Sequence, residues 1–136
     1  MKEIYISVVK RLAELPKLIK DKQSENLKID REINDKDYWK KKQENAIKSE
    51  IFSETLENGK KAFTNETLRN DEFLTRSEKN TEYQETLKEF NLSQEVKKAL
   101  EVELNCLYNE FSAIKYTIRV YELMADLDSN GTRGRS

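Results

Sequence analysis

The sequence predicts an all-α protein, an elongated long-helix hairpin or coiled coil with a short N-terminal helix and a shorter third helix. Between residues 100 and 125, apolar side chains recur at alternating steps of four and three, as a coiled-coil seam requires. Charged residues make up 38% of the 136 residues and apolar residues only 36%, which suits helices that each bury one stripe. Only 3 Gly and 1 Pro interrupt helix-forming sequence.

The length is that of one domain, so we expect a single helical domain at 1–128 followed by a flexible tail at 129–136. Such a polar composition is also typical of disordered chains. The periodic seam argues against disorder in the C-terminal half, and less strongly in the N-terminal half.

The first helix is predicted at about residues 3–15. Its apolar residues follow steps of four and three: Ile4, Val8, Leu12 and Leu15. Ile4, Ile6 and Val8 also alternate, which leaves a strand as the alternative. Pro16 lacks a backbone donor and is expected to end or bend the helix.

The second helix is predicted at about residues 17–57, which contain neither Gly nor Pro. Its apolar residues are sparse, and lysines occupy positions at which the apolar register would continue. The stability of this helix therefore depends on packing against another element. An interruption is possible at Asn34-Asp35, and Asn58-Gly59 is a clear stop signal.

Two further helices are predicted beyond this stop. Thr64 or Asn65 caps a helix at 65–79, and Asn80 caps a long helix at about 81–127. A helix of that length extends about 70 Å, too long for a globule of this size.

The long last helix carries the seam that we expect to be an oligomer interface. Its residues are Leu100, Leu104, Leu107, Phe111, Ile114, Ile118 and Tyr121, followed by Ala125. The seam could pack within the chain against 17–57, or against copies of itself. Because the seam of 17–57 is broken, we expect residues 96–125 to stay partly uncovered in a monomer and to form a homo-oligomer. Tyr108, Tyr116 and Arg119 lie off this seam and are candidates for a second packing surface.

Two basic and aromatic patches are candidate nucleic-acid-binding sites. The first patch is Tyr38, Trp39, Lys40, Lys41 and Lys42, and the second is Lys60, Lys61 and Arg69, close in sequence to Phe63. Lysines neutralise phosphates, and aromatic rings stack unpaired bases at about 1–3 kcal/mol per base. Residues 1–42 hold 12 Lys and Arg against 8 Asp and Glu, so the basic excess lies in this third. The alternative is that Trp39 is a packing anchor and the lysines form a solvated face.

The residue types argue against several classes of function. The chain has no His, its glycines are 59, 131 and 134, and Cys106 is its one cysteine. We therefore expect no catalytic residues, metal ligands or cofactor, no small-molecule substrate, and no enzyme activity. The net charge is −1 and no apolar run has the length of a membrane span, so we expect no membrane contact. One cysteine suits a reducing cytoplasm.

Three segments resemble small coiled-coil proteins of phages and prophages associated with recombination functions. They are KAFTNETLR at 61–69, NTEYQ at 80–84 and LYNEFSAIK at 107–115. More loosely, the size and the aromatic-basic patch are similar to the recombination mediator proteins of tailed phages. The resemblance implies an oligomer that contacts single-stranded DNA or a recombination protein, first through 38–42 and then through Lys60, Lys61 and Arg69.

The sequence therefore leaves two candidate functions. The first is a non-enzymatic oligomeric accessory protein for DNA recombination or replication that contacts single-stranded nucleic acid. The second is a helical adaptor or inhibitor that binds another protein and makes no nucleic-acid contact.

Overall fold

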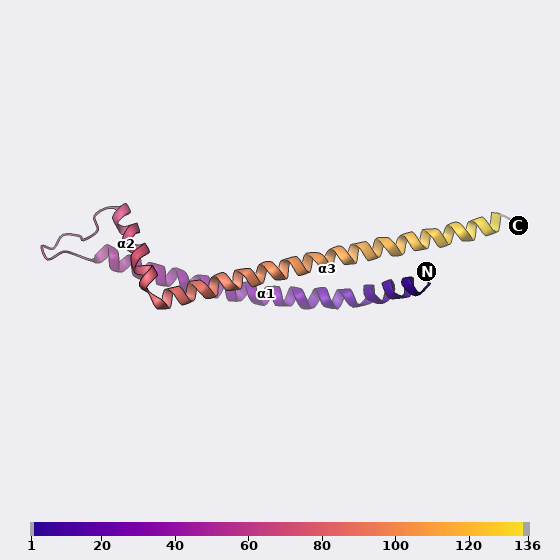
Figure 1. The fold of residues 1–136 in the computed structure, drawn as a ribbon, viewed down its shortest axis with the longest axis horizontal. Helices are drawn as coiled ribbons and strands as arrows, with labels where there is room; N and C mark the ends of the chain where they lie inside the picture. Colours follow the sequence, from indigo (N-terminus) through magenta and orange to yellow (C-terminus); the bar gives the residue numbers. More distant parts are fainter. Residues whose placement is uncertain (1, 135–136) are drawn as a thin grey trace. The chain divides into compact units, whose positions relative to one another are not determined.

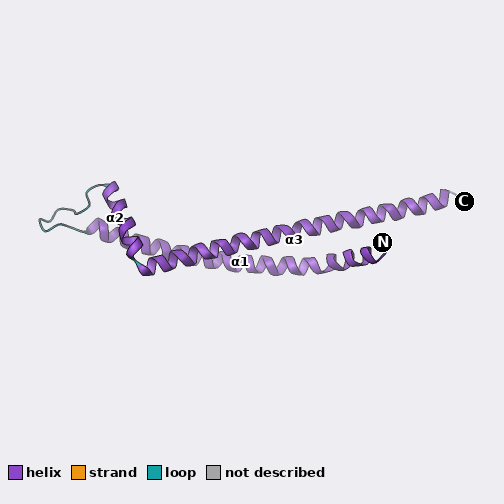
Figure 2. Ribbon diagram, in the orientation of Figure 1, coloured by secondary structure: helices purple, strands orange, loops and turns teal. Residues whose placement is uncertain are grey.

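The computed structural model describes residues 2–134, and over these residues the chain is all-α, as the sequence predicts (Figures 1 and 2). It forms three helices, α1 (Lys2–Ser53), α2 (Glu66–Lys79) and α3 (Thr81–Gly134). The contacts divide the chain into two units. We call 28–97 the central unit, and the described residues of 1–27 and 98–136 the terminal unit.

The two predicted N-terminal helices are one continuous helix, α1, with Pro16 inside it. The expected helix end at Pro16 is therefore wrong, as are the possible interruption at Asn34-Asp35 and the strand alternative for residues 4–8. A proline inside a helix costs about 3 kcal/mol because a backbone hydrogen bond is lost. The side chain of Leu15, the residue before it, is 0% exposed, so tertiary packing holds this turn in place.

The segment after α1 is a small hairpin loop. The helix ends at Ser53 rather than near residue 57. The amide of Leu56 donates to the carbonyl of Lys60 at 2.7 Å, and the amide of Gly59 donates to the carbonyl of Leu56 at 2.9 Å. Gly59 has φ 82°, the left-handed conformation that a three-residue hairpin loop needs. Asn58-Gly59 is thus a turn, as its composition indicates, but it does not end the helix.

Asparagine side chains cap α2 and α3 at the predicted positions. Oδ1 of Asn65 accepts from the amide of Leu68 at 2.9 Å, and Oδ1 of Asn80 accepts from the amide of Tyr83 at 2.9 Å. α3 continues to Gly134, so the predicted tail is helical as far as that residue. The rest of the predicted tail, 135–136, lies outside the described residues.

The central unit has a compact apolar cluster to which all three helices contribute. Its members are Ile47 and Ile51 of α1 and Tyr83 of α3, with Phe63, Phe73 and Leu87 packed against them. Burial raises the pKa of the Tyr83 hydroxyl, and the neighbouring Glu44 carboxylate adds to this effect. This cluster fixes the end of α1 and the start of α3 around α2.

The terminal unit consists of the first 27 residues beside the later part of α3. The Tyr5 and Tyr121 rings meet edge to face at 5.7 Å between centroids. Further along, Arg11 bonds Glu110 at 2.6 Å and Lys22 bonds Glu103 at 2.8 Å. Because one residue number rises as the other falls, the two segments run antiparallel. The paired Arg11 guanidinium holds the pKa of Glu110 below its usual value.

Candidate functional site

The predicted oligomer seam is partly covered within the terminal unit. Leu100 and Leu104 are buried, at 9% and 7% exposure. The other five predicted interface residues are half-buried: Leu107, Phe111, Ile114, Ile118 and Tyr121. Residues 2–27 lie along this seam and cover it only in part, since five of its seven positions are half-buried. The homo-oligomer expected over 96–125 stays a prediction.

The first basic patch is divided among different contacts. Lys40 turns inward, 5.2 Å from the centroid of Phe90, and pairs with Glu44 at 3.2 Å. Lys41 pairs with Asp37 at 2.8 Å. Two of the three lysine charges in this patch are therefore compensated by carboxylates one turn away.

The two aromatic side chains of the first patch remain exposed. Tyr38 and Trp39 are 60% and 48% exposed, and their rings meet edge to face at 5.6 Å. Lys42 lies 4.9 Å from the centroid of Trp39.

The surroundings of Trp39 are acidic. A surface hollow that Trp39 helps to line contains four carboxylates and one lysine: Asp35, Glu82, Glu85, Glu89 and Lys36. Four carboxylates around Trp39 repel a phosphate backbone that approaches its ring. The lysine run that looks basic in the sequence therefore has an acidic neighbour, supplied by the first turns of α3.

The second basic patch gathers around a ring that the sequence does not single out. Phe52 is 57% exposed at the end of α1. Nζ of Lys61 lies 4.2 Å from its centroid and donates to its backbone carbonyl at 2.9 Å. Arg69 of α2 lies 5.7 Å from the same centroid. Lys60, by contrast, belongs to the hairpin loop, where its amide donates to Asn58 Oδ1 at 3.0 Å.

Phe63, which the sequence places beside the second patch, instead contacts a different cation. Arg76 lies 5.6 Å from its centroid and bonds Glu72 at 2.7 Å. Since the hairpin loop turns Phe63 into the central cluster, Phe52 takes its place beside Lys61. No local pattern in the sequence reveals this exchange, because it depends on where the loop folds back.

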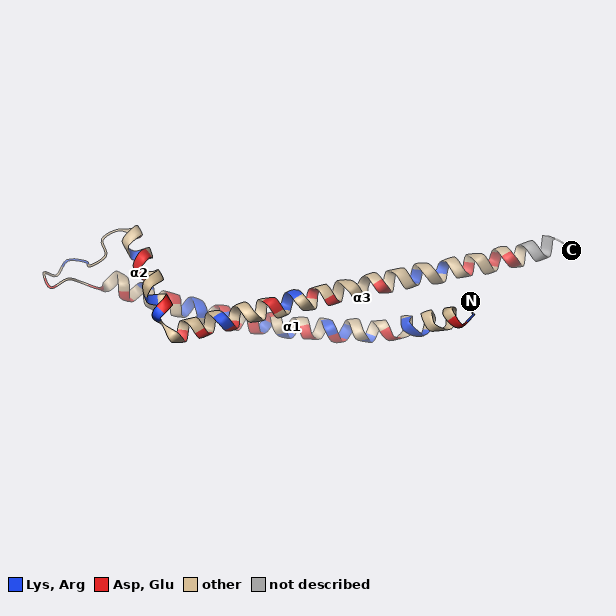
Figure 3. Ribbon diagram, in the orientation of Figure 1, with Lys and Arg blue, Asp and Glu red and all other residues tan. Residues whose placement is uncertain are grey.

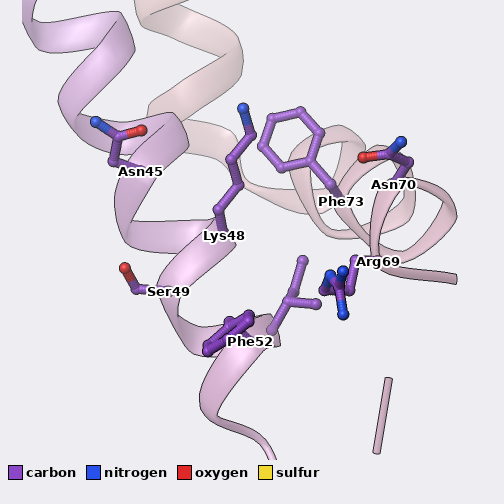
Figure 4. Close-up of a pocket in the computed structure, with 8 residues that line it drawn as sticks. Asn45, Lys48, Ser49, Phe52, Arg69, Asn70 and Phe73 are labelled. Atoms are coloured by element: carbon purple, nitrogen blue, oxygen red, sulfur yellow. The ribbon is translucent and has the colours of Figure 1, made fainter. Parts of the chain in front are cut away.

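A cavity of about 450 Å³ lies between α1 and α2 beside Phe52 (Figure 4). Its lining residues are Asn45, Lys48, Ser49, Ile51, Phe52, Arg69, Asn70 and Phe73. We call it the Phe52 pocket. Lys48 points toward Phe73, with Nζ 5.2 Å from the ring centroid. The lining holds two cations, two aromatic rings and no carboxylate, so it suits an anionic group attached to a flat ring.

Residues 2–134 hold neither a candidate metal cluster nor a candidate membrane span. In that range no group of three or more acidic or Cys side chains is placed to hold a metal ion. No helix in the same range is both long enough and apolar enough to cross a membrane.

Comparison with known proteins gives no relative for this chain. No family model matches it, and neither the curated proteins nor the solved structures include a match.

Proposed function

We propose that the protein is a non-enzymatic adaptor or inhibitor, a coiled-coil hairpin that binds another protein through exposed apolar side chains. The observation that carries this proposal is the excess of exposed apolar groups. Among the described residues, 7 hydrophobic side chains are buried and 21 large ones are exposed. Where such side chains adjoin one another on the surface, they are typical of protein-binding sites. Lys and Arg alternate with Asp and Glu along α1 and α3, so no extended field of one sign competes with such contacts (Figure 3).

The exposed apolar groups are densest near the start of α1. Tyr5, Ile6 and Val9 are 37%, 55% and 40% exposed within little more than one turn. Val9 lies four residues after Tyr5 and three after Ile6, so the three side chains share one side of α1 and form a docking stripe for a partner helix or groove. We therefore place the binding surface for another protein on this N-terminal stripe.

A pull-down from the cells that make the protein tests this surface. The chain is immobilised in three forms: unaltered, Ile6→Glu with Val9→Glu, and the matched control Ser7→Glu. Ser7 is exposed on the same turns, so the control adds the same kind of charge without removing apolar surface. We expect at least one protein to be retained by the unaltered chain and the control and lost from the double variant. Identical retention profiles for all three would refute the proposed surface.

A second candidate function is supported by the Phe52 pocket. Lys61 and Arg69 flank the exposed ring of Phe52, and Lys48 lies beside Phe73 across the pocket. Such an arrangement suits a phosphate beside a stacked base. Such a site suits an accessory protein for DNA recombination or replication that contacts single-stranded DNA. This candidate retains Lys61 and Arg69 of the predicted site and moves its centre away from residues 38–42.

Salt dependence tests the second candidate with a labelled single-stranded oligothymidine. Three phosphate contacts give a slope of about −2 for log affinity against log salt, at roughly −0.7 per phosphate. Lys48→Ser with Arg69→Ser is expected to remove about 1.4 of that slope. Replacing Lys40, Lys41 and Lys42 with Ser is the matched control, because two of these lysines are paired with carboxylates. Loss of binding in that control alone would assign the contact to residues 38–42 instead.

A further inference from the structure

α3 carries a second heptad series in the terminal unit, on the face turned away from residues 2–27. Its members again follow alternating steps of three and four: Ala99, Val102, Cys106, Asn109, Ala113, Tyr116, Val120, Leu123 and Leu127. All nine are exposed. They span four heptads, about 42 Å of helix, and lie roughly 150° around the helix from the covered seam. We call this series the outer seam.

We propose that the outer seam pairs with the outer seam of a second copy of this chain, in antiparallel orientation. Four heptads with seam spacing are the length at which a coiled-coil interpretation becomes strong. Residues 2–27 pack on the covered seam, so they do not compete for this face. The inference concerns a different surface from the N-terminal stripe and does not depend on the proposed adaptor function.

Side-chain size favours the antiparallel orientation. The N-terminal half of the outer seam is small, and its C-terminal half is large. An antiparallel copy centred near residue 111 sets Ala99 against Leu123, Cys106 against Tyr116 and Val102 against Val120. A parallel copy would set Tyr116 against Tyr116 and Ala99 against Ala99, which leaves crowded layers beside empty ones.

Charge along the outer seam supports the same orientation. Lys98 and Asp126 flank its two ends, and neither forms an ion pair within residues 2–134. In the antiparallel pair, each Lys98 meets Asp126 of the other copy, so two complementary contacts form. Near the two-fold axis, Glu110 lies close to Glu110 of the other copy. Arg11 of the same chain neutralises each of these carboxylates with bonds of 2.6 and 3.1 Å.

Disulfide trapping of the full chain tests both the surface and the orientation. Tyr116→Cys places a new thiol opposite Cys106 of the other copy, so mild oxidation is expected to give a covalent dimer. The unaltered chain should stay uncrosslinked, because its Cys106 faces Tyr116. Two controls should also stay uncrosslinked: Tyr116→Cys with Cys106→Ser, and Glu122→Cys, which puts the second thiol off the seam. Efficient crosslinking of the unaltered chain would indicate a parallel pair and overturn the proposal.

Mass measurement by sedimentation provides the second readout. The unaltered chain is expected to be a dimer. Val120→Asp with Leu123→Asp should weaken self-association on the order of 100-fold, because it buries charges without partners. Both residues face away from residues 2–27, so helicity measured by circular dichroism should be retained. Lys115→Asp, off the seam, should leave the dimer intact. A monomeric unaltered chain, or a double variant that dimerises as well as the control, would overturn the proposal.

Discussion

Replacing Leu15 with Ala tests the packing that carries α1 through Pro16. Leu15 is 0% exposed, although it lies at the point where the sequence predicts a helix end. Truncating a buried leucine to alanine removes its transfer free energy and leaves a cavity, at a cost of about 2–5 kcal/mol. Folded domains are stable by only about 5–15 kcal/mol, so this one change removes a large share.

Leu18 provides the matched control for this experiment. It lies one turn further along the same helix and is 38% exposed, so Leu18→Ala should cost about 1 kcal/mol or less. Urea unfolding followed by circular dichroism measures both free energies of unfolding. A deficit of at least about 1 kcal/mol for Leu15→Ala relative to Leu18→Ala is expected. Equal values would show that the start of α1 does not pack on α3, and the reasoning would fail.

Three further predictions concern single side chains in the central unit. Gly59→Ala meets no atom within 4 Å, so its cost should be conformational alone, about 1–2 kcal/mol for a left-handed residue in thermal unfolding. Asn80→Ala removes the cap of α3 and should cost about 1 kcal/mol in the same assay, whereas Asn80→Asp should preserve the cap. Because the pKa of Tyr83 is raised on folding, its contribution is constant below about pH 10, the unfolded value, and falls above it. Tyr83→Phe should therefore lose less stability than the unaltered chain between neutral and strongly alkaline pH.

Local signals in the sequence predict much of the fold. The caps at Asn65 and Asn80 are correct because a capping bond involves residues only three apart. The seven seam positions of α3 are buried or half-buried, as their period indicates, because that period is a property of one helix. Its partner is not local, so the sequence leaves open what covers it.

At Pro16 and at residues 38–42, the surrounding structure changes what the local sequence indicates. Proline's local cost predicts a helix end, but the packing of Leu15 offsets that cost. Lysine's local charge predicts a basic patch, but Asp37 and Glu44 lie one turn away along the helix. Lys40, Lys41 and Lys42 are consecutive in the sequence, but a helix separates consecutive residues by about 100°. In a helical protein, charge is therefore better assessed along one face of the helix than along consecutive residues.

The outer seam is missed in the sequence because its members share one face of a helix and are not consecutive residues. Its small members, Ala99, Cys106 and Ala113, do not register as apolar anchors beside the leucines of the covered seam. Eight of its nine members are apolar and all nine are exposed, and these two properties together identify them as a set. A helix with two seams roughly 150° apart can hold residues 2–27 on one side and a second chain on the other. Intrachain folding and self-association would then be separable by mutation, since Leu104 serves only the first and Leu123 only the second.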